Sequence, residues 1–159
     1  MIKISVVAMG KLKESYLSCA CNEYIKRLSR YCDIDVKELP PENLPDNPSE
    51  ALIKAALSKE ATKIEKAIPK NSQVIALCVE GNELSSEMFA KTVGDFENEG
   101  RPICFVIGSS YGLDERIKNS AGKKLSLSKM TFPHQLFRVI LLEQIYRAFK
   151  INEGGTYHK

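Results

Sequence analysis

Short apolar runs and longer amphipathic segments alternate along this chain of 159 residues. The runs at 74–79 and 103–107 are almost wholly apolar, which indicates strands that are covered on both faces. Residues 2–9 form a third apolar, β-branched run, and residues 34–39 alternate with period two, as a strand with one solvated face does. A fifth short run, at 125–128, also has the character of a strand. The pattern therefore predicts five strands.

The segments between and after these runs have helical character. Ser49 and either Ser85 or Ser86 are suited to cap two of these helices, and Pro69 and Gly100 are suited to end them. The predicted helices cover residues 13–31, 49–68, 85–98, 113–121 and 133–150. Buried strands joined by helices form a parallel sheet with helices on both faces, so we expect an α/β fold. Because internal repeats and low-complexity tracts are lacking, residues 1–159 are predicted to be a single domain.

One connection stands out by its proline content. Residues 40–48 read Pro-Pro-Glu-Asn-Leu-Pro-Asp-Asn-Pro, which suits neither a helix nor a strand. A structureless loop of this length inside a small domain is commonly a functional segment rather than a linker. We expect this proline-rich segment to be a lid or a contact surface.

The helix predicted at 133–150 is apolar around nearly its whole circumference, and Pro133 suits its first turn. A helix of this kind is buried on more than one side. One side must face the sheet of its own chain, and we expect the other to face a second copy of the chain in a homodimer. Arg138 lies inside the apolar arc, where an unpaired charge is costly. It therefore has either a structural carboxylate partner or an anionic ligand.

Composition excludes several classes of protein. Hydrophobic residues make up 43% of the chain and charged residues 27%, as in a soluble globular protein. No apolar run approaches the ~18 residues of a membrane span. The N-terminus lacks the features of a signal peptide, so we expect a cytoplasmic protein. Five cysteines without a Cys-x-x-Cys pair indicate free thiols rather than disulfides, and we expect no metal site.

The net charge of +3 is unevenly distributed. Residues 123–159 carry seven lysines and arginines against two acidic residues, whereas acidic residues are in slight excess before them. The last quarter of the chain is therefore the candidate surface for a polyanion such as RNA. The alternative is a solvated, charged terminus.

Three predicted strand ends are rich in glycine or serine, namely residues 77–81, 107–112 and 127–130. Ligands of parallel sheets bind at the carboxyl ends of the strands, and glycine lets a ligand approach the backbone closely. Ordinary turn chemistry would explain any one of these glycines alone. The sequence contains neither a dinucleotide-binding nor a phosphate-binding loop motif.

Residues 108–112, Gly-Ser-Ser-Tyr-Gly, match the Gly-x-Ser-x-Gly motif of hydrolases, after a buried strand and before a helix. Ser110 would be the nucleophile, with His134 or His158 as the base. The acidic residues downstream have no obvious role in orienting a histidine, and 159 residues are few for that fold. The motif therefore gives only weak support for a hydrolase.

A family resemblance lies in the last quarter of the chain. Residues 126–135 read Ser-Leu-Ser-Lys-Met-Thr-Phe-Pro-His-Gln, residues 138–150 read Arg-Val-Ile-Leu-Leu-Glu-Gln-Ile-Tyr-Arg-Ala-Phe-Lys, and the chain ends in Tyr-His-Lys. With these motifs the chain resembles, over its whole length, the large-subunit ribosomal RNA methyltransferase H family of the SPOUT class. The resemblance implies an α/β knot, in which the C-terminal segment is threaded into a trefoil, an exception to the rule that folds are unknotted. It also implies methylation of N3 of a pseudouridine in a 23S rRNA hairpin, in assembled ribosomes, with S-adenosyl-L-methionine as the donor.

The resemblance also implies site residues. Backbone groups of three strand ends would hold the donor, at Leu77, Gly108, Leu127, Ser128, Lys129, Met130, Thr131 and Phe132. The family usually has two glycines where this chain has Gly108 and Ser109. The catalytic or RNA-binding candidates are His134, Arg138, Arg147, Tyr157 and His158.

Three of these candidates also have a simpler interpretation. His134 could act as a base, because imidazole titrates near neutrality, or it could cap a helix. Tyr157 could stack on a base and His158 with Lys159 could bind phosphate, or the three could form a flexible tail. Two functions of different classes therefore stay open: a dimeric rRNA methyltransferase, and a non-catalytic RNA- or ribosome-binding α/β protein. Saturable binding of S-adenosylmethionine would distinguish them.

Overall fold

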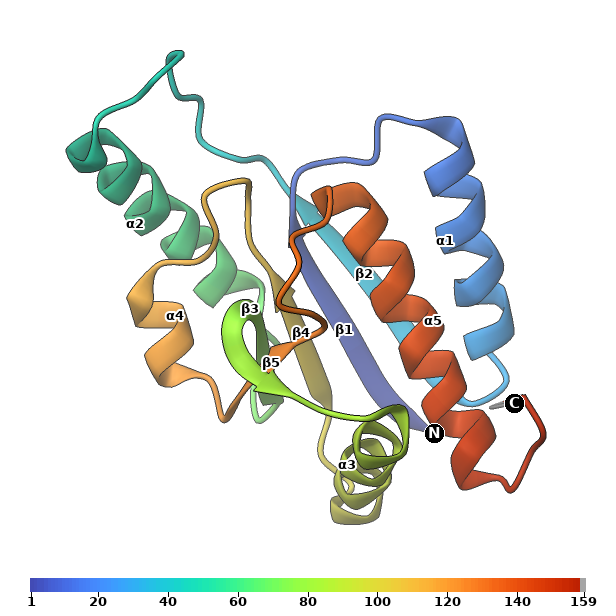
Figure 1. Cartoon of the computed structure of the whole chain (residues 1–159). Coiled ribbons are helices and arrows are strands. Elements are labelled where there is room, and N and C mark those ends of the chain that lie inside the picture. Colours follow the sequence, from blue (N-terminus) through green and yellow to red (C-terminus); the bar gives the residue numbers. More distant parts are fainter. Residues whose placement is uncertain (158–159) are drawn as a thin grey trace.

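The fold is taken from a computed structural model, which describes residues 1–157 (Figure 1). Within that range five strands alternate with five helices. In chain order they are β1 (Ile2–Met9), α1 (Ser15–Leu28), β2 (Cys32–Leu39), α2 (Glu50–Ala67), β3 (Gln73–Glu83), α3 (Ser86–Glu99), β4 (Ile103–Ile107), α4 (Glu115–Ser120), β5 (Lys123–Ser126) and α5 (His134–Asn152). The predicted alternation of strand and helix is confirmed.

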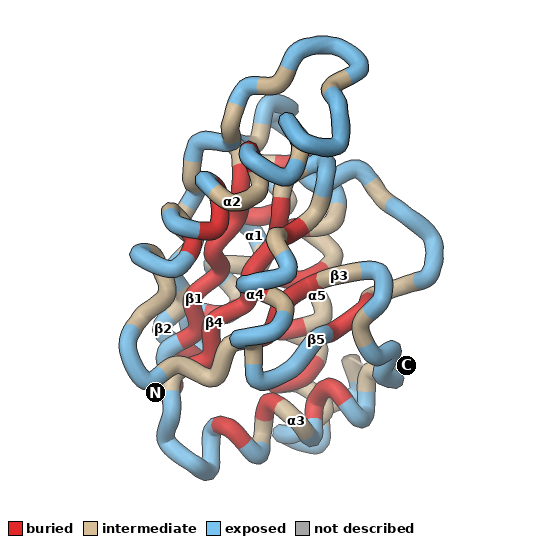
Figure 2. Tube along the Cα trace, turned by 90° about the vertical axis from the view of Figure 1, so that its left-hand side faces the viewer, coloured by how far each residue is buried: buried red, intermediate tan, exposed pale blue. Residues whose placement is uncertain are grey.

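The strands form one parallel sheet in the order β2-β1-β4-β3-β5. All of β4 and nearly all of β1 are buried, as Figure 2 shows, because these apolar runs lie in the middle of the sheet. The alternating strand β2 lies at the edge and keeps exposed polar positions. The α/β class and the parallel sheet predicted from the sequence are thus confirmed.

Helices cover both faces of the sheet, because successive strand residues point to opposite sides. Ile4 and Val6 of β1 face one core with residues of α1, α3 and α5, whereas Val7 faces a second core with residues of α2 and α4. Figure 1 shows this division, with α2 and α4 on one side of the sheet and α1 and α5 on the other. The loops at the carboxyl ends of the strands are left free to form a site.

Two helices begin and one ends at the residues that the sequence indicated. The Ser49 hydroxyl accepts a hydrogen bond from the Leu52 N–H at 3.2 Å, and the Ser85 hydroxyl accepts one from the Met88 N–H at 3.1 Å. Gly100 follows α3 with a φ of 68°, a left-handed conformation that suits glycine. These caps confirm the predicted boundaries of α2 and α3.

Other boundaries were predicted wrongly. Gly81 does not end β3, which continues to Glu83 after a shift in its register with β5 between Leu77 and Asn82. The strand is no longer buried after Leu77, and Val79 is 53% exposed rather than covered on both faces. The last strand ends at residue 126 instead of 128, and α1 and α4 are shorter than predicted. In α4 the cause is an Asp114 cap, whose carboxylate accepts from the Arg116 N–H at 2.8 Å.

Two further features concern the whole described chain. No helix among residues 1–157 is long and apolar enough to cross a membrane. The five cysteines are free thiols, and burial raises the pKa of Cys32 and of Cys104 to about 12. Thiols with such pKa values stay protonated and unreactive at neutral pH.

Candidate functional site

Three segments meet at the carboxyl edge of the sheet and enclose a cavity of about 360 Å³, named here the central cavity. They are residues 77–80 of β3, residues 108–113 after β4 and residues 126–132 around the end of β5. His134 and Phe137 of α5 complete the wall. Of the eight predicted donor-binding residues, seven line this cavity, and Lys129 does not. The volume lies within the ~300–1,000 Å³ range of small-molecule sites.

The loop after β4 is closed so tightly that its first residue must be glycine. The Gly112 N–H donates to the Ser109 carbonyl at 2.9 Å, which folds the loop back on itself. A Cβ atom at Gly108 would lie 2.3 Å from the Gly112 carbonyl oxygen, far inside van der Waals contact. Gly112 itself has a φ of 88°, which side-chain-bearing residues rarely adopt. The loop therefore presents its backbone to the central cavity.

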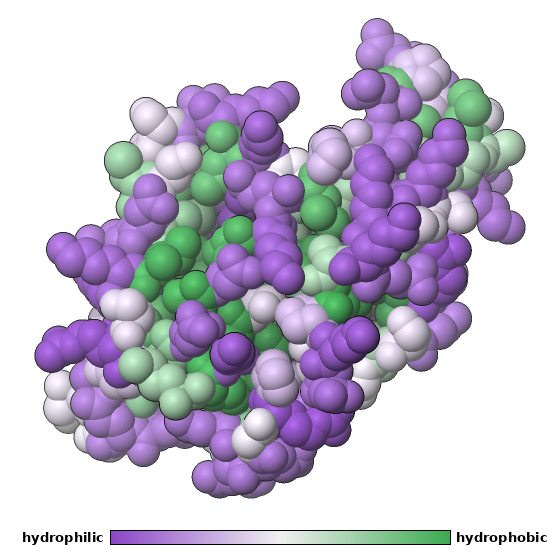
Figure 3. Space-filling model, turned by 180° about the vertical axis from the view of Figure 1, so that it is seen from behind, coloured by the Kyte–Doolittle hydropathy of each residue, from purple (hydrophilic) through white to green (hydrophobic). Residues whose placement is uncertain are grey.

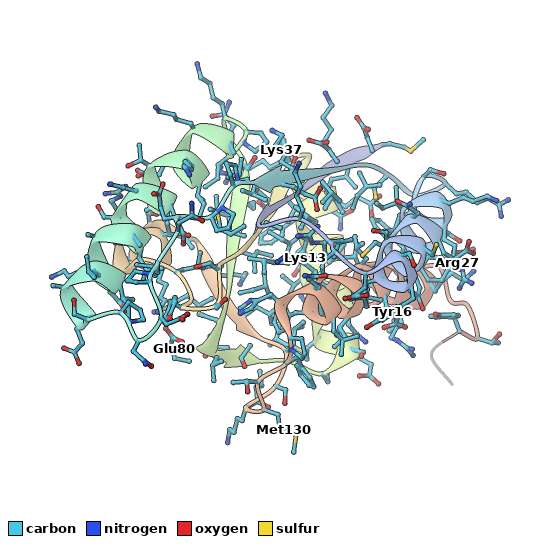
Figure 4. The ribbon with its side chains drawn as sticks, turned by 90° about the horizontal axis from the view of Figure 1, so that it is seen from above. Lys13, Tyr16, Arg27, Lys37, Glu80 and Met130 are labelled. Carbon is cyan, nitrogen blue, oxygen red and sulfur yellow. The ribbon has the colours of Figure 1, made fainter. Side chains whose placement is uncertain are left out.

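The loop after β5 is shaped by its own serines. The Ser126 hydroxyl donates to the Ser128 carbonyl at 2.9 Å, and the Ser128 hydroxyl accepts from the Met130 N–H at 3.0 Å. These hydroxyls are thus used within the loop, so a ligand would meet mainly backbone groups and apolar side chains there. Met130 is 75% exposed and projects away from the body of the molecule (Figure 4).

An ion pair that the sequence analysis missed forms another part of the wall. The Lys118 ammonium of α4 contacts the Glu80 carboxylate of β3 and lies 3.4 Å from the Glu115 carboxylate. Its hydrogen bond to Glu80 lowers the pKa of that carboxyl. Nothing local in the sequence indicates the pair, because its members lie on separate elements and meet only through the fold.

His134 lies where the central cavity meets a second, larger opening. Partial desolvation in the cavity wall lowers the pKa of its imidazole, so the ring is neutral at physiological pH. It makes no hydrogen bond with any other side chain or backbone group of residues 1–157. The fold therefore places His134, one of the predicted catalytic candidates, at the central cavity. Its neutral imidazole is able to accept a proton.

The second opening, named here the entry groove, has a volume of about 710 Å³ and shares Ser109, Ser110 and His134 with the central cavity. Lys13 lines it from the loop before α1 and Tyr16 from the first turn of α1, and Tyr16 is 68% exposed. Figure 4 looks down on this end of the molecule. From behind, the surface is hollowed between the lobe with the proline-rich segment and the rest of the protein (Figure 3).

Arg138 has the structural carboxylate partner that was one of its two predicted roles. It is 4% exposed, and its Nη1 lies 2.5 Å from Oε2 of Glu38. Its Nη2 donates to the Gly10 carbonyl at 3.0 Å, and the Leu12 N–H donates to the same Glu38 oxygen at 3.1 Å. Arg138 thus ties α5 to β2 and to the loop after β1, which carries the lysines of the entry groove.

Arg147 and Tyr157 lie at the other end of α5. The Arg147 guanidinium pairs with Glu143 at 2.6 Å and lies 5.0 Å from the centre of the Tyr157 ring, which contacts Tyr146 edge-on. A helix of 19 residues is about 28 Å long, so this cluster is remote from the central cavity of the same chain. His158 lies outside the described residues.

The hydrolase motif does not form a strained nucleophile turn. Among residues 1–157, the non-glycine residues with positive φ are Asn47 and Asn71, so Ser110 lacks that strain. Its hydroxyl has no hydrogen-bond partner within the described chain, and so no histidine activates it there.

We therefore expect Ser110 to be unreactive. A fluorophosphonate probe should leave the protein unlabelled, because an unactivated serine hydroxyl is a weak nucleophile. Mass spectrometry of the treated protein measures this, with a known serine hydrolase as the positive control. Stoichiometric labelling at Ser110 would restore the hydrolase hypothesis.

No metal site is found among residues 1–157, which contain no group of three His, Cys, Asp or Glu side chains arranged to hold an ion.

Comparison with known proteins gives a consistent picture. Residues 2–158 match the family described as "Predicted SPOUT methyltransferase". The chain is 52% identical to the ribosomal RNA large subunit methyltransferase H of Clostridium novyi (strain NT), over 99% of this chain and all of that protein. It is 48% identical, with the same coverage, to the protein of that name from Clostridioides difficile (strain 630).

A solved structure also resembles this fold. It is that of a probable methylase family protein from Haemophilus influenzae Rd KW20, with a TM-score of 0.57 over 99% of this chain and 70% of that one. At 14% identity the likeness concerns the fold alone.

Proposed function

The chain belongs to the SPOUT methyltransferase family, and from this premise we propose that it is a ribosomal RNA large subunit methyltransferase H, which methylates N3 of a pseudouridine in 23S rRNA. The observation that carries the proposal is the central cavity, where three segments at the carboxyl edge of the sheet gather seven of the eight predicted donor-binding residues. The relatives named above supply the substrate class, since they share about half of their residues with this chain over its full length.

The residues around the central cavity suit S-adenosyl-L-methionine. Leu77, Ile107, Leu127 and Phe137 offer an apolar surface for an adenine ring, and the loop at Gly108 offers backbone groups at close range. When bound, this donor supplies an activated methyl group on a sulfonium. The task left to the protein is to align the reacting atoms and to exclude competing reactions.

His134 supports a role in handling the imide proton of the target base. It stands where the central cavity meets the entry groove, so a base entering from the groove would pass it on the way to the donor. Its lowered pKa keeps the imidazole neutral and able to accept a proton at physiological pH. Arg138, by contrast, is used in fixing the loop after β1.

The entry groove supports RNA as the substrate. Lys11 and Lys13 provide positive charge, and the exposed Tyr16 provides an aromatic face on which a base can stack. Sequence analysis placed the RNA-binding surface in the last quarter of the chain, and the groove adds the start of α1 to it. Glu14 is the acidic residue of this wall, so the groove suits a few phosphates rather than a long basic track.

We also propose the finer features that the family resemblance implies. Residues 1–159 form one knotted domain in the cytoplasm, which acts as a homodimer on assembled ribosomes. The course of the chain supports a knot: β5 lies at one sheet edge, yet α5 packs against α1 near the other side. A Cβ atom at Gly81 would lie 2.7 Å from the Leu125 backbone, so β3 packs closely against the segment that leads into α5.

The proposal is tested by donor binding and methyl transfer together. Calorimetry with S-adenosylmethionine should give saturable heat, and assembled ribosomes that lack the modification should accept one radiolabelled methyl group each. Ribosomes with uridine in place of the target pseudouridine are the control and should accept less. A protein that bound ribosomes but gave no heat with the donor would instead be the non-catalytic RNA-binding protein.

A further inference from the structure

A buried carboxylate on α2 joins the proline-rich segment to the loop that closes the central cavity. Glu60 is 4% exposed. Its Oε1 accepts a hydrogen bond from the Ser109 hydroxyl at 2.8 Å, and its Oε2 accepts one from the backbone N–H of Glu42 at 3.0 Å. A buried carboxylate is costly unless its oxygens are hydrogen-bonded, so both donors help to keep Glu60 in place.

Ser109 is the point at which this link reaches the central cavity. Its carbonyl closes the loop by accepting from the Gly112 N–H, while its hydroxyl is held by Glu60. The residue lines the central cavity, the entry groove and a third cavity, of about 850 Å³, under the proline-rich segment. A second glycine at this position would have no hydroxyl, so the link depends on the serine of this chain.

The proline-rich segment is fastened to the same helix at a second point. The Lys63 ammonium lies 3.0 Å from the Glu42 carboxylate and donates to the Pro40 carbonyl at 2.8 Å. The hydrogen bond from Lys63 lowers the pKa of the Glu42 carboxyl. Lys63 thus holds the segment on α2, whereas Glu60 holds both the segment and the cavity loop.

We infer that Glu60 is a positioning residue for the methyl donor. It fixes Ser109, and through it residues 108–112, in the shape that encloses the donor, and it transmits occupancy of the central cavity to residues 40–48. The inference rests on the proposed function, because it takes the central cavity as the donor site. Coupling of this kind is reciprocal: what orders the proline-rich segment also strengthens donor binding.

Removing either end of the link should weaken donor binding. We expect Ser109→Ala and Glu60→Ala each to raise the Kd for S-adenosylmethionine about tenfold, the typical effect of losing a hydrogen bond to a charged group. Calorimetry on the full-length protein measures this. The double variant should bind no more weakly than Glu60→Ala alone, because the two changes remove one shared interaction.

Conservative variants separate positioning from general stability. Ser109→Thr keeps the hydroxyl, and Glu60→Gln can still accept from the Glu42 N–H while its amide donates to Ser109, so both should bind the donor nearly as the wild type does. Ser58→Ala, two residues before Glu60 on the same helix, is the matched control. A merely structural role would lower the melting temperature of Ser109→Ala and leave its Kd unchanged, which would overturn the inference.

Hydrogen exchange tests the transmitted effect. Adding S-adenosylmethionine should slow the exchange of backbone amide hydrogens in residues 40–48 of the wild type and of Ser58→Ala. It should not slow this exchange in Ser109→Ala. Equal protection in Ser109→Ala and the wild type would overturn the coupling and leave the proposed function standing. A wild type that binds no donor would overturn the proposed function and this inference with it.

Discussion

Replacing Gly108 with valine is expected to weaken binding of S-adenosylmethionine severely while the chain remains folded. A Cβ atom at this position would meet the carbonyl oxygen of Gly112 at 2.3 Å and its carbonyl carbon at 2.6 Å. Both are backbone atoms of the loop that lines the central cavity, so the loop must open to relieve the contact. Overpacking of this kind costs about 1–3 kcal/mol, and we expect the upper end, a roughly 100-fold rise in Kd.

Calorimetry measures the Kd, and thermal unfolding checks that the variant folds. Gly108→Ala should already bind S-adenosylmethionine more weakly than the wild type, because the clash involves the Cβ atom itself. Gly122→Ala is the matched control, since a Cβ atom there would lie 3.7 Å from its nearest neighbours, an ordinary contact. Normal donor binding by Gly108→Val would mean that the donor does not occupy the central cavity.

The main features of the fold could be predicted because they depend on periodicity. The strands at 74–79 and 103–107 are apolar runs, and a central strand of a parallel sheet requires such a run. The boundaries that failed depend instead on tertiary contacts. Where β3 ends is decided by its pairing with β5 beyond the bulge, and no residue near Gly81 reports that pairing.

For the candidate site too, the sequence predicted the local features but not the tertiary contacts. Glycine- and serine-rich strand ends indicated which loops would meet, because the carboxyl ends of parallel strands share one edge. Three polar pairs were missed or left open, since each joins residues far apart in the chain. They are Glu60 with Ser109, Glu80 with Lys118, and Arg138 with Glu38. For Arg138 the sequence could state the need for a partner, but only the fold could supply it.

The surface of α5 determines how a dimer can be tested. We proposed that a second copy of the chain covers its outer face, where Leu136 is 38% exposed and Val139 is half-buried. Ile145 of the same helix is fully buried in the chain's own core. Ile145→Glu should therefore unfold the protein. Leu136→Glu is the sharper test, because it should give a folded monomer in sedimentation. Leu52→Glu on α2, across the sheet, is its control and should leave the dimer intact.

Deleting residues 157–159 is expected to abolish methylation of ribosomes while leaving dimer and donor binding intact. Tyr157 contacts Tyr146 near the end of α5, whereas His134 begins that helix beside the central cavity, so Tyr157 is remote from the central cavity of its own chain. In a symmetric dimer that pairs α5 faces, the tail of one protomer can complete the site of its partner. Sedimentation should give a dimer at micromolar concentration for the wild type and for the deletion variant. Methyl transfer should fall at least ~100-fold in the deletion variant, as expected when substrate positioning is lost.

Mixing the deletion variant with Gly108→Val then offers a decisive measurement. The two proteins are each inactive, but a mixed dimer has one intact donor site facing one intact tail, so activity should return. A fully active deletion, a monomeric wild type, or mixed dimers without activity would each contradict a site shared between protomers.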